Sequence, residues 1–189
     1  MRCAAKDWLH YYLICTPPEN MTTYDYAELV TEKPVKRFLQ KFCLSDEQFE
    51  SLVIVSPWIG TLEGVRFTLA YVLDLVGRRQ IPTYVITRQP EESWHQQAID
   101  MLLRCNWVEL RYNSSLHAKL YVCKQREGRG FAMLGSGNLS RTSIEKNIEI
   151  GMMIYGRGRG RGLLHELFSW GTIRLRTQSK LVKKMERRV

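Results

Sequence analysis

No apolar run in the 189-residue sequence approaches the roughly 18 residues that are needed to cross a bilayer. The five cysteines are odd in number, and none of them stands in a Cys-x-x-Cys pair. Neither a disulfide framework nor a zinc site is therefore predicted, and free thiols in a reducing cytoplasm are expected. The sequence also lacks an internal repeat, so a motif that occurs once has no second copy in the chain.

Acidic residues are in the minority. The chain has 28 Lys and Arg against 19 Asp and Glu, a net charge of +9 and a pI of about 9.5. This balance favours a polyanionic partner such as nucleic acid, although many basic proteins bind none. A Gly-Arg run with Arg157, Arg159 and Arg161 either follows a phosphate backbone or is a mobile loop. The basic segment from Arg174 onward either binds polyanions or is disordered.

Apolar runs alternate with helical patterns through the middle of the chain. Strands are predicted at 51–56, 81–87 and 108–112, and helices at 32–43, 62–77 and 91–105. This order indicates an α/β layer architecture. In the last of these helices, Trp94 is expected to point inward and His95 to lie at the surface. We expect a helical segment at 1–47 that packs on a catalytic domain at 48–172, followed by a basic tail at 173–189.

The first candidate site residues lie in Leu-His-Ala-Lys-Leu-Tyr-Val, a run at 116–122 with strand character. Side chains alternate along a strand, so His117 and Lys119 share one face while apolar residues occupy the other. An imidazole next to an ammonium is an unusual pair unless an anion lies between them. The run therefore indicates an anion-binding surface.

A turn of composition Gly-Ser-Gly-Asn follows at 135–138. Its glycines permit positive φ and close approach of a ligand, and consecutive N–H groups in such a turn can bind an anion. Ser136 and Asn138 add side-chain donors. Ser140 is predicted to cap a short helix through Lys146, whose positive end favours the same anion.

One carboxylate belongs to the next predicted strand. In Asn-Ile-Glu-Ile-Gly-Met at 147–152, Glu149 lies on the face opposite Ile148, Ile150 and Met152. A carboxylate at this position can accept the Nδ1–H of an imidazole and fix its tautomer, which leaves Nε2 free to attack.

Taken together, these pieces resemble the phospholipase D superfamily, and within it the single-motif phospholipase D-like nucleases. The matching residues are His117-Ala118-Lys119, Gly135-Ser136-Gly137-Asn138 and Asn147-Ile148-Glu149. The resemblance implies an α/β fold in which a mixed central β-sheet is flanked by helices on both faces. There are two departures. Lys124 stands where the family has Asp, and residues 124–130 are expected to form a longer hairpin loop than usual.

The resemblance also implies hydrolysis of a phosphodiester without a metal or another cofactor. One His attacks phosphorus and forms a phosphohistidine, and a second His protonates the leaving oxygen and later activates water. Lys119, Asn138 and Ser136 would hold the phosphate oxygens, and Glu149 would orient His117. Each motif supplies one His, so the resemblance implies a homodimer in which the two His117 side chains face each other.

Two residues outside the motifs are further candidates for contact with nucleic acid. Trp58 follows a predicted core strand, where it either stacks on a base or sugar or packs in the core. Arg88 ends the next strand, where it either touches phosphate or is solvated. The expected partners are nucleic acid, DNA before RNA, and a second copy of the chain, and no membrane partner is expected.

Two other functions are weighed against the endonuclease. A non-catalytic nucleic-acid-binding or assembly module with the same fold is the alternative, because Lys124 replaces the motif Asp. A lipid phosphodiesterase is disfavoured, because the chain lacks a membrane-binding stretch and its charge suits a polynucleotide at least as well.

Overall fold

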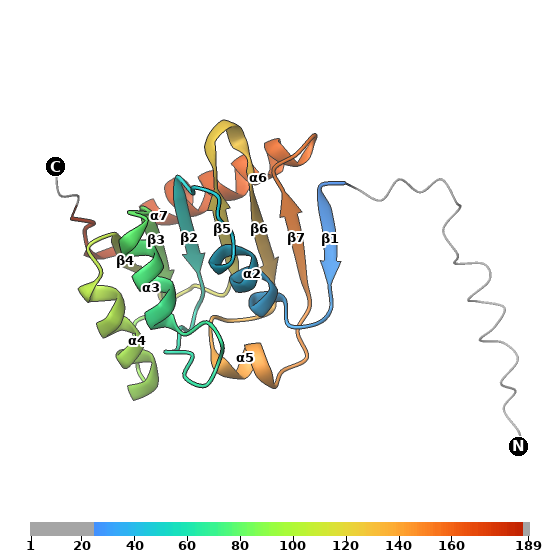
Figure 1. Cartoon of the computed structure of the whole chain (residues 1–189). Helices are drawn as coiled ribbons and strands as arrows, with labels where there is room; N and C mark the ends of the chain where they lie inside the picture. Colours follow the sequence, from blue (N-terminus) through green and yellow to red (C-terminus); the bar gives the residue numbers. More distant parts are fainter. Residues whose placement is uncertain (1–24, 187–189) are drawn as a thin grey trace, which may run out of the picture.

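The computed structural model describes residues 25–186, which form one eight-stranded sheet between two layers of helices (Figure 1). The strands are β1 (Ala27–Val30), β2 (Ser51–Val55), β3 (Thr83–Thr87), β4 (Val108–Tyr112), β5 (Leu120–Lys124), β6 (Gly130–Gly135), β7 (Gly151–Tyr155) and β8 (Lys180–Lys183). The helices and helical turns are α2 (Pro34–Cys43), α3 (Leu69–Arg78), α4 (Ser93–Arg104), η1 (Arg126–Gly128), α5 (Arg141–Glu145), α6 (Gly160–Ser169), η2 (Trp170–Arg174) and α7 (Leu175–Thr177).

The order of strands in the sheet is β1-β7-β6-β5-β2-β3-β4-β8. Strands β2, β3 and β4 run parallel to one another, and every other neighbouring pair is antiparallel. The sheet is therefore mixed, and the fold class expected from the sequence is confirmed.

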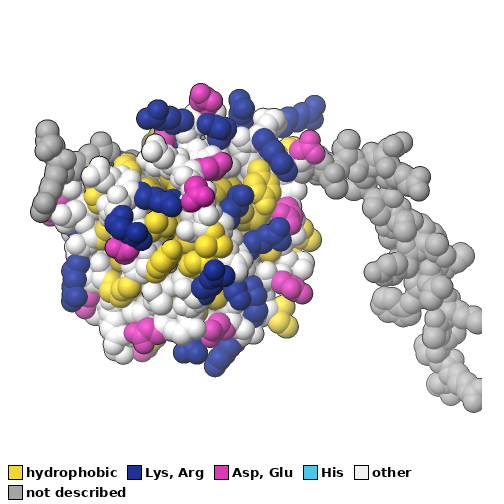
Figure 2. Space-filling view, in the orientation of Figure 1, with side chains coloured by type: hydrophobic (Ala, Val, Ile, Leu, Met, Phe, Trp, Pro, Cys, Tyr) yellow, Lys and Arg dark blue, Asp and Glu magenta, His cyan; other side chains and the backbone are white. Residues whose placement is uncertain are grey.

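Both faces of the sheet are covered, which explains why β2 is apolar at nearly every position. Leu52 and Ile54 belong to the core that includes α2, α3 and α4, on the near side in Figure 1. Val53 and Val55 belong to a second core with Leu164 of α6, on the far side. Figure 2 shows the near face, where hydrophobic side chains form a band across the middle that Lys and Arg side chains surround.

The helix predicted at 32–43 is present as α2, which begins two residues later than predicted, at Pro34, and ends at Cys43 as predicted. Its residues Val35, Phe38 and Phe42 are buried, at the spacing of one helical face. The longer hairpin between β5 and β6 is also present, and η1 forms its tip.

Helix α3 begins seven residues later than the pattern predicted. Leu62 and Gly64 adopt left-handed φ values of 59° and 80°, so the chain turns where the prediction placed the first helical residues. The helix begins only after Thr68, whose Oγ1 accepts a hydrogen bond from the Tyr71 N–H at 3.2 Å. The apolar residues of this loop are buried although they are not helical. Their spacing resembles that of a helical face, so the predicted helix began too early.

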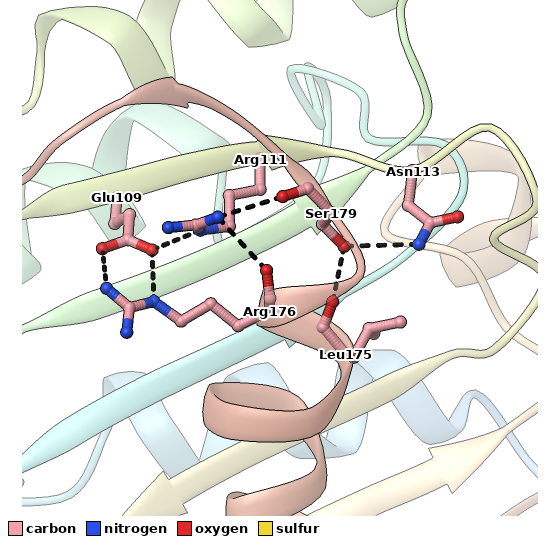
Figure 3. Close-up of polar contacts among 6 residues, drawn as sticks. All are labelled: Glu109, Arg111, Asn113, Leu175, Arg176 and Ser179. Atoms are coloured by element: carbon pink, nitrogen blue, oxygen red, sulfur yellow. Dashed lines mark hydrogen bonds and ion pairs between the residues drawn. The ribbon is translucent and has the colours of Figure 1, made fainter.

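The C-terminal segment is part of the fold through residue 183. Strand β8 pairs with β4 at the sheet edge. Glu109 of β4 accepts two hydrogen bonds from Arg176, at 2.6 and 2.8 Å, and one from Arg111 at 2.6 Å (Figure 3). At the opposite edge of the sheet, β1 pairs with β7. The single sheet therefore includes strands from all three of the predicted segments, 1–47, 48–172 and 173–189. Residues 1–24 of the helical segment predicted at 1–47 lie outside the described residues.

Within the described range, no helix is long and apolar enough to cross a bilayer. Cys43, Cys105 and Cys123 are free thiols, and Cys43 and Cys123 are buried. The other two cysteines precede the described residues.

Candidate active site

The predicted site residues come from three neighbouring strands that meet at one edge of the sheet, beside α5 (Figure 1). His117 and Lys119 precede β5, Ser136 follows β6, and Glu149 precedes β7. The strands continue to pair beyond their ends. The Gly135 N–H donates to the Lys119 carbonyl at 3.3 Å, and the Ser136 N–H donates to the Ile150 carbonyl at 2.9 Å. We call this end of the three strands the catalytic edge, after the residues that are predicted from the sequence to be catalytic.

Glu149 is 8% exposed, and both oxygens of its carboxylate accept hydrogen bonds. Its Oε2 accepts a hydrogen bond from Ser136 Oγ, and its Oε1 accepts one from Asn147 Nδ2 at 3.1 Å. Burial acts to raise the pKa of this carboxyl, but the hydrogen bonds from Ser136 and Asn147 and the charge of Lys119 together lower it. The site therefore contains a fixed negative charge next to the predicted phosphate ligands.

Lys119 is partly buried, and two charges of opposite sign, those of Glu149 and Arg88, act on its ammonium. Burial lowers the pKa of Lys119, the charge of Glu149 opposes that change, and the charge of Arg88 adds to it. The net pKa of Lys119 lies below its ordinary value.

The imidazole of His117 is exposed at the catalytic edge. Within residues 25–186, His117 makes no hydrogen bond to Glu149, whose carboxylate accepts from Ser136 and Asn147 and is also stabilised by a hydrogen bond from Ser143. The structure thus brings the two side chains to the same edge, and the orienting role predicted for Glu149 stays a prediction.

The Gly-Ser-Gly-Asn turn requires glycine for space rather than for a left-handed φ. A Cβ at Gly135 would lie 2.4 Å from the Ile150 carbonyl oxygen, and one at Gly137 would lie 2.8 Å from Val35 Cγ2. The Gly137 carbonyl accepts a hydrogen bond from Tyr121 Oη at 2.9 Å. The turn is therefore packed tightly against the start of β7, against α2 and against Tyr121 of β5.

Three of the four N–H groups in the turn where an anion-binding nest is predicted donate hydrogen bonds within the protein. The N–H groups of Gly135 and Ser136 donate within the sheet, and that of Asn138 donates to Ser143 Oγ at 3.1 Å. Among the described residues, Asn138 Oδ1 is the one buried side-chain oxygen without a hydrogen-bond donor. Buried acceptors of this kind are rare in native proteins. The N-cap prediction is confirmed, because Ser140 Oγ accepts from the Ser143 N–H at 3.4 Å.

Arg88 and Trp58 stand next to the motif. Arg88 Nε donates to the Leu116 carbonyl at 2.8 Å, so Arg88 fixes the backbone immediately before His117. The Arg88 guanidinium also lies 5.3 Å from the centre of the Trp58 ring. Trp58 is 37% exposed, which makes it a surface aromatic of the site rather than a core residue.

Trp94 also lies in this region, and the sequence pattern does not identify it as a site residue because it assigns the wrong face of α4 to the core. Trp94 was expected to point inward and His95 outward, but Trp94 is 42% exposed and His95 is 2% exposed. The buried side chains of α4 follow the spacing 95, 98, 99 and 102. His95 Nε2 lies 3.2 Å from Thr87 Oγ1, so a polar residue takes part in the buried face. That spacing was the signal that could have placed Trp94 at the surface.

Comparison by sequence finds neither a protein-family model nor a curated protein that matches the chain. Comparison by structure finds similar folds. Nuc from Salmonella typhimurium, described as a phospholipase D family member, has a TM-score of 0.63 at 13% identity over 84% of this chain and 99% of its own. NucT from Helicobacter pylori has a TM-score of 0.59 at 14% identity over 82% and 98%.

The chain has the phospholipase D fold. TrmBL2, an archaeal chromatin protein described as binding DNA, shares it at a TM-score of 0.53 and 15% identity, over 93% of this chain and 59% of TrmBL2.

The departure at position 124 lies outside the catalytic edge. Lys124 is the last residue of β5, five residues or ~17 Å of extended strand beyond Lys119. Lys124 Nζ lies 3.6 Å from a Glu50 carboxylate oxygen and 4.9 Å from the centre of the Phe168 ring. Lys124, which stands where the resemblance expects Asp, therefore lies at the end of β5 that is farther from His117.

The Gly-Arg run lies at the other border of the sheet. Residues 156–162 follow the carboxyl end of β7, whereas the catalytic edge lies at its amino end (Figure 1). Arg157 is 5.2 Å from the Tyr155 ring centre and donates to the Asp25 carbonyl. The structure does not bring Arg157, Arg159 and Arg161 together with His117.

In the described part of the chain, no group of three or more His, Cys, Asp or Glu side chains is placed to hold a metal ion.

Proposed function

We propose that the protein is a metal-independent endonuclease that hydrolyses phosphodiester bonds of nucleic acid, DNA in the first instance. The observation that carries the proposal is the meeting of His117, Lys119, Ser136 and Glu149 at one edge of a phospholipase D fold. The net charge of +9 supports a polyanionic substrate.

Each residue type at the catalytic edge supports one step. Nε2 of His117 attacks phosphorus, so that a P–N bond forms as the P–O bond to the leaving group breaks. The imidazole of a second His117 gives its proton to the leaving oxygen, then takes a proton from water, whose oxygen attacks phosphorus and breaks the P–N bond. Lys119 and Asn138 stabilise the non-bridging oxygens, and Ser136 assists them.

The second imidazole comes from a second copy of the chain in this proposal. Four exposed apolar side chains border the catalytic edge, and we call them the apolar strip: Leu29, Ile148, Ile150 and Met152, which are 61%, 101%, 53% and 40% exposed. Leu29 and Met152 are cross-strand neighbours, and the Ile150 carbonyl accepts from Ser136. An exposed apolar surface next to an incomplete site favours a two-fold interface there.

A two-fold pair also gives Glu149 a part in the reaction. Since Glu149 makes no hydrogen bond to His117 of its own chain, it can orient an imidazole only if His117 changes rotamer or if the imidazole belongs to the second subunit. We include this orienting contact in the proposal.

The proposal is tested by assaying cleavage of single-stranded and duplex DNA and RNA in excess EDTA. Cleavage is expected to persist, and His117→Ala is expected to lower the rate by about a thousandfold or more. His165→Ala is the matched control, because His165 is an exposed histidine of α6. Cleavage that a clean His117→Ala preparation retains would reject the assignment.

A non-catalytic nucleic-acid-binding module is the second candidate. It is favoured by the similarity in fold to TrmBL2, which is described as a DNA-binding chromatin protein. Acid-labile labelling of His117 by a 32P-containing substrate separates the two candidates, because only the enzyme forms a phosphohistidine.

A further inference from the structure

A cavity of about 560 Å³ adjoins the catalytic edge. Its walls come from the loop after β2, the first turns of α4 and the segment from Asn138 through α5. The residues that matter for its chemistry are Trp58, Glu63, Trp94, Gln97, Asn138 and Arg141. Asn138 belongs both to this cavity and to the proposed phosphate site, so a group in the cavity lies next to the reacting phosphate.

Two partly exposed indole rings line the cavity, and each is held by a neighbour. Trp58 is 37% exposed and has the Arg88 guanidinium 5.3 Å from its ring centre. Trp94 is 42% exposed and stacks on the buried His95 ring with centroids 5.6 Å apart and an angle of 23°. A ring that is already fixed loses little conformational entropy when a ligand stacks on it.

Within the described part of the chain, the cavity has no unpaired positive charge in its lining, because its one cation is already paired with a carboxylate. Arg141 Nε donates to the Glu145 carboxylate at 2.7 Å, and Glu63 adds a further negative charge. This lining does not favour a phosphate group. Indole rings with amide and hydroxyl groups around them favour a flat, neutral, aromatic ligand that has its own donors and acceptors.

We propose that this cavity is a nucleobase subsite, which holds one unpaired base next to the phosphate that is cleaved. The inference rests on the proposed function and deepens it to a preference for single-stranded nucleic acid. A base inside a duplex is stacked and paired, so it enters such a pocket only after it is extruded, whereas a base of a single strand stacks directly on aromatic side chains.

The test measures binding rather than cleavage. A short fluorescein-labelled oligothymidylate is titrated with the full chain carrying His117→Ala, and affinity is followed by anisotropy. Oligomers with one abasic nucleotide at successive positions are then compared with the intact strand. One abasic position is expected to weaken binding about tenfold, because stacking of one base on an aromatic side chain is commonly worth that much.

The same scan with Trp58→Ala and Trp94→Ala shows whether that base contacts the two rings. Each variant is expected to bind the intact strand about tenfold more weakly and to lose most of its sensitivity to the abasic position, since both changes remove one interaction. Trp58→Phe and Trp94→Phe are expected to retain most of the affinity. Tyr71→Ala is the matched control, because Tyr71 is 39% exposed and lies on α3 outside the cavity.

An abasic effect of equal size in the parent and in both Trp→Ala variants would overturn the subsite, as would equal affinity for single strand and duplex. These binding measurements do not depend on whether the protein cleaves its ligand. Cleavage in EDTA that depends on His117 but not on the tryptophans leaves the proposed function standing and removes the subsite. If the abasic effect depends on the two tryptophans but the protein never cleaves nucleic acid, the subsite stands and the proposed function is rejected.

Discussion

At the scale of single residues, the state of Lys119 depends on two neighbours with opposite effects. Burial lowers its pKa, Glu149 acts to raise the pKa, and Arg88 acts to lower it further. A phosphate ligand is held by the protonated form, so the alkaline limit of phosphate binding follows the pKa of this one ammonium.

Glu149→Gln is expected to lower the pKa of Lys119, because it removes the negative charge that favours the ammonium. Arg88→Gln is expected to raise that pKa by removing a positive charge. The alkaline limb of the pH–rate profile should therefore move to lower pH in the first variant and to higher pH in the second. NMR titration of the Lys119 side chain checks the same shifts without relying on activity, and shifts of the same sign in both variants would contradict the assignment.

The residues of the motif were predictable from the sequence, whereas their contacts were not. Alternation along strands predicts His117 and Lys119 on one face and Glu149 opposite Ile150, because that rule depends only on local geometry. In the structure these residues immediately precede β5 and β7, which begin at Leu120 and Gly151. Hydrogen-bond partners depend on rotamers and on packing across strands. For that reason the donors to Glu149 include Ser136 and Asn147, where the sequence suggested the imidazole.

At the scale of elements, helix α7, which leads into the last strand, is held by a carboxylate far away in the sequence. Glu109 binds Arg176, 67 residues later, and the Arg111 guanidinium also donates to carbonyls of Arg176 and Ser179 (Figure 3). A charge count along the C-terminal segment shows an excess of cations and gives no sign of this pairing. The sequence therefore suggested a basic tail where the structure has a folded edge.

Glu109→Gln is expected to lower the free energy of unfolding by about 3 kcal/mol, since it leaves two guanidinium groups without their shared carboxylate. Burial raises the pKa of Glu109, but the arginines lower it below its ordinary value on balance. Its contribution is therefore present above the ordinary carboxyl pKa and is lost as pH falls through the lowered one. Urea unfolding at neutral and acidic pH measures both effects.

Glu50→Gln is the control for this experiment. Glu50 lies 3.6 Å from Lys124 and its side chain is 41% exposed, so its loss is expected to cost no more than about 0.5 kcal/mol. Equal effects of the two substitutions would show that the Glu109 cluster does not stabilise the C-terminal edge.

At the scale of the whole molecule, the strand order determines which surfaces surround the site. Because β7 and β1 lie at one end of the sheet, the apolar strip continues from the catalytic edge onto exposed strands. The architecture was predictable from alternating strands and helices and from the resemblance. The places of β1 and β8 at the two edges were not, because long-range pairing leaves no local periodic signal.

Ile150→Glu is expected to weaken self-association by about a hundredfold or more, because the two-fold axis brings two added carboxylates into one apolar interface. Cleavage should fall with the loss of the dimer. Ile173→Glu is the control, since Ile173 is 64% exposed on η2, outside the strip. Sedimentation velocity measures both variants, and an active wild-type protein that sediments as a monomer would contradict the two-subunit site.

The location of residues 156–162, beyond the carboxyl end of β7, has a consequence for substrate length. If two subunits join through their catalytic edges, the Gly-Arg run of each subunit lies at an outer end of the dimer, and hydrolysis takes place midway between the two runs. A dinucleotide then reaches only the centre. A longer polynucleotide gains electrostatic attraction at the extremities, so affinity rises with strand length and that gain disappears in high salt.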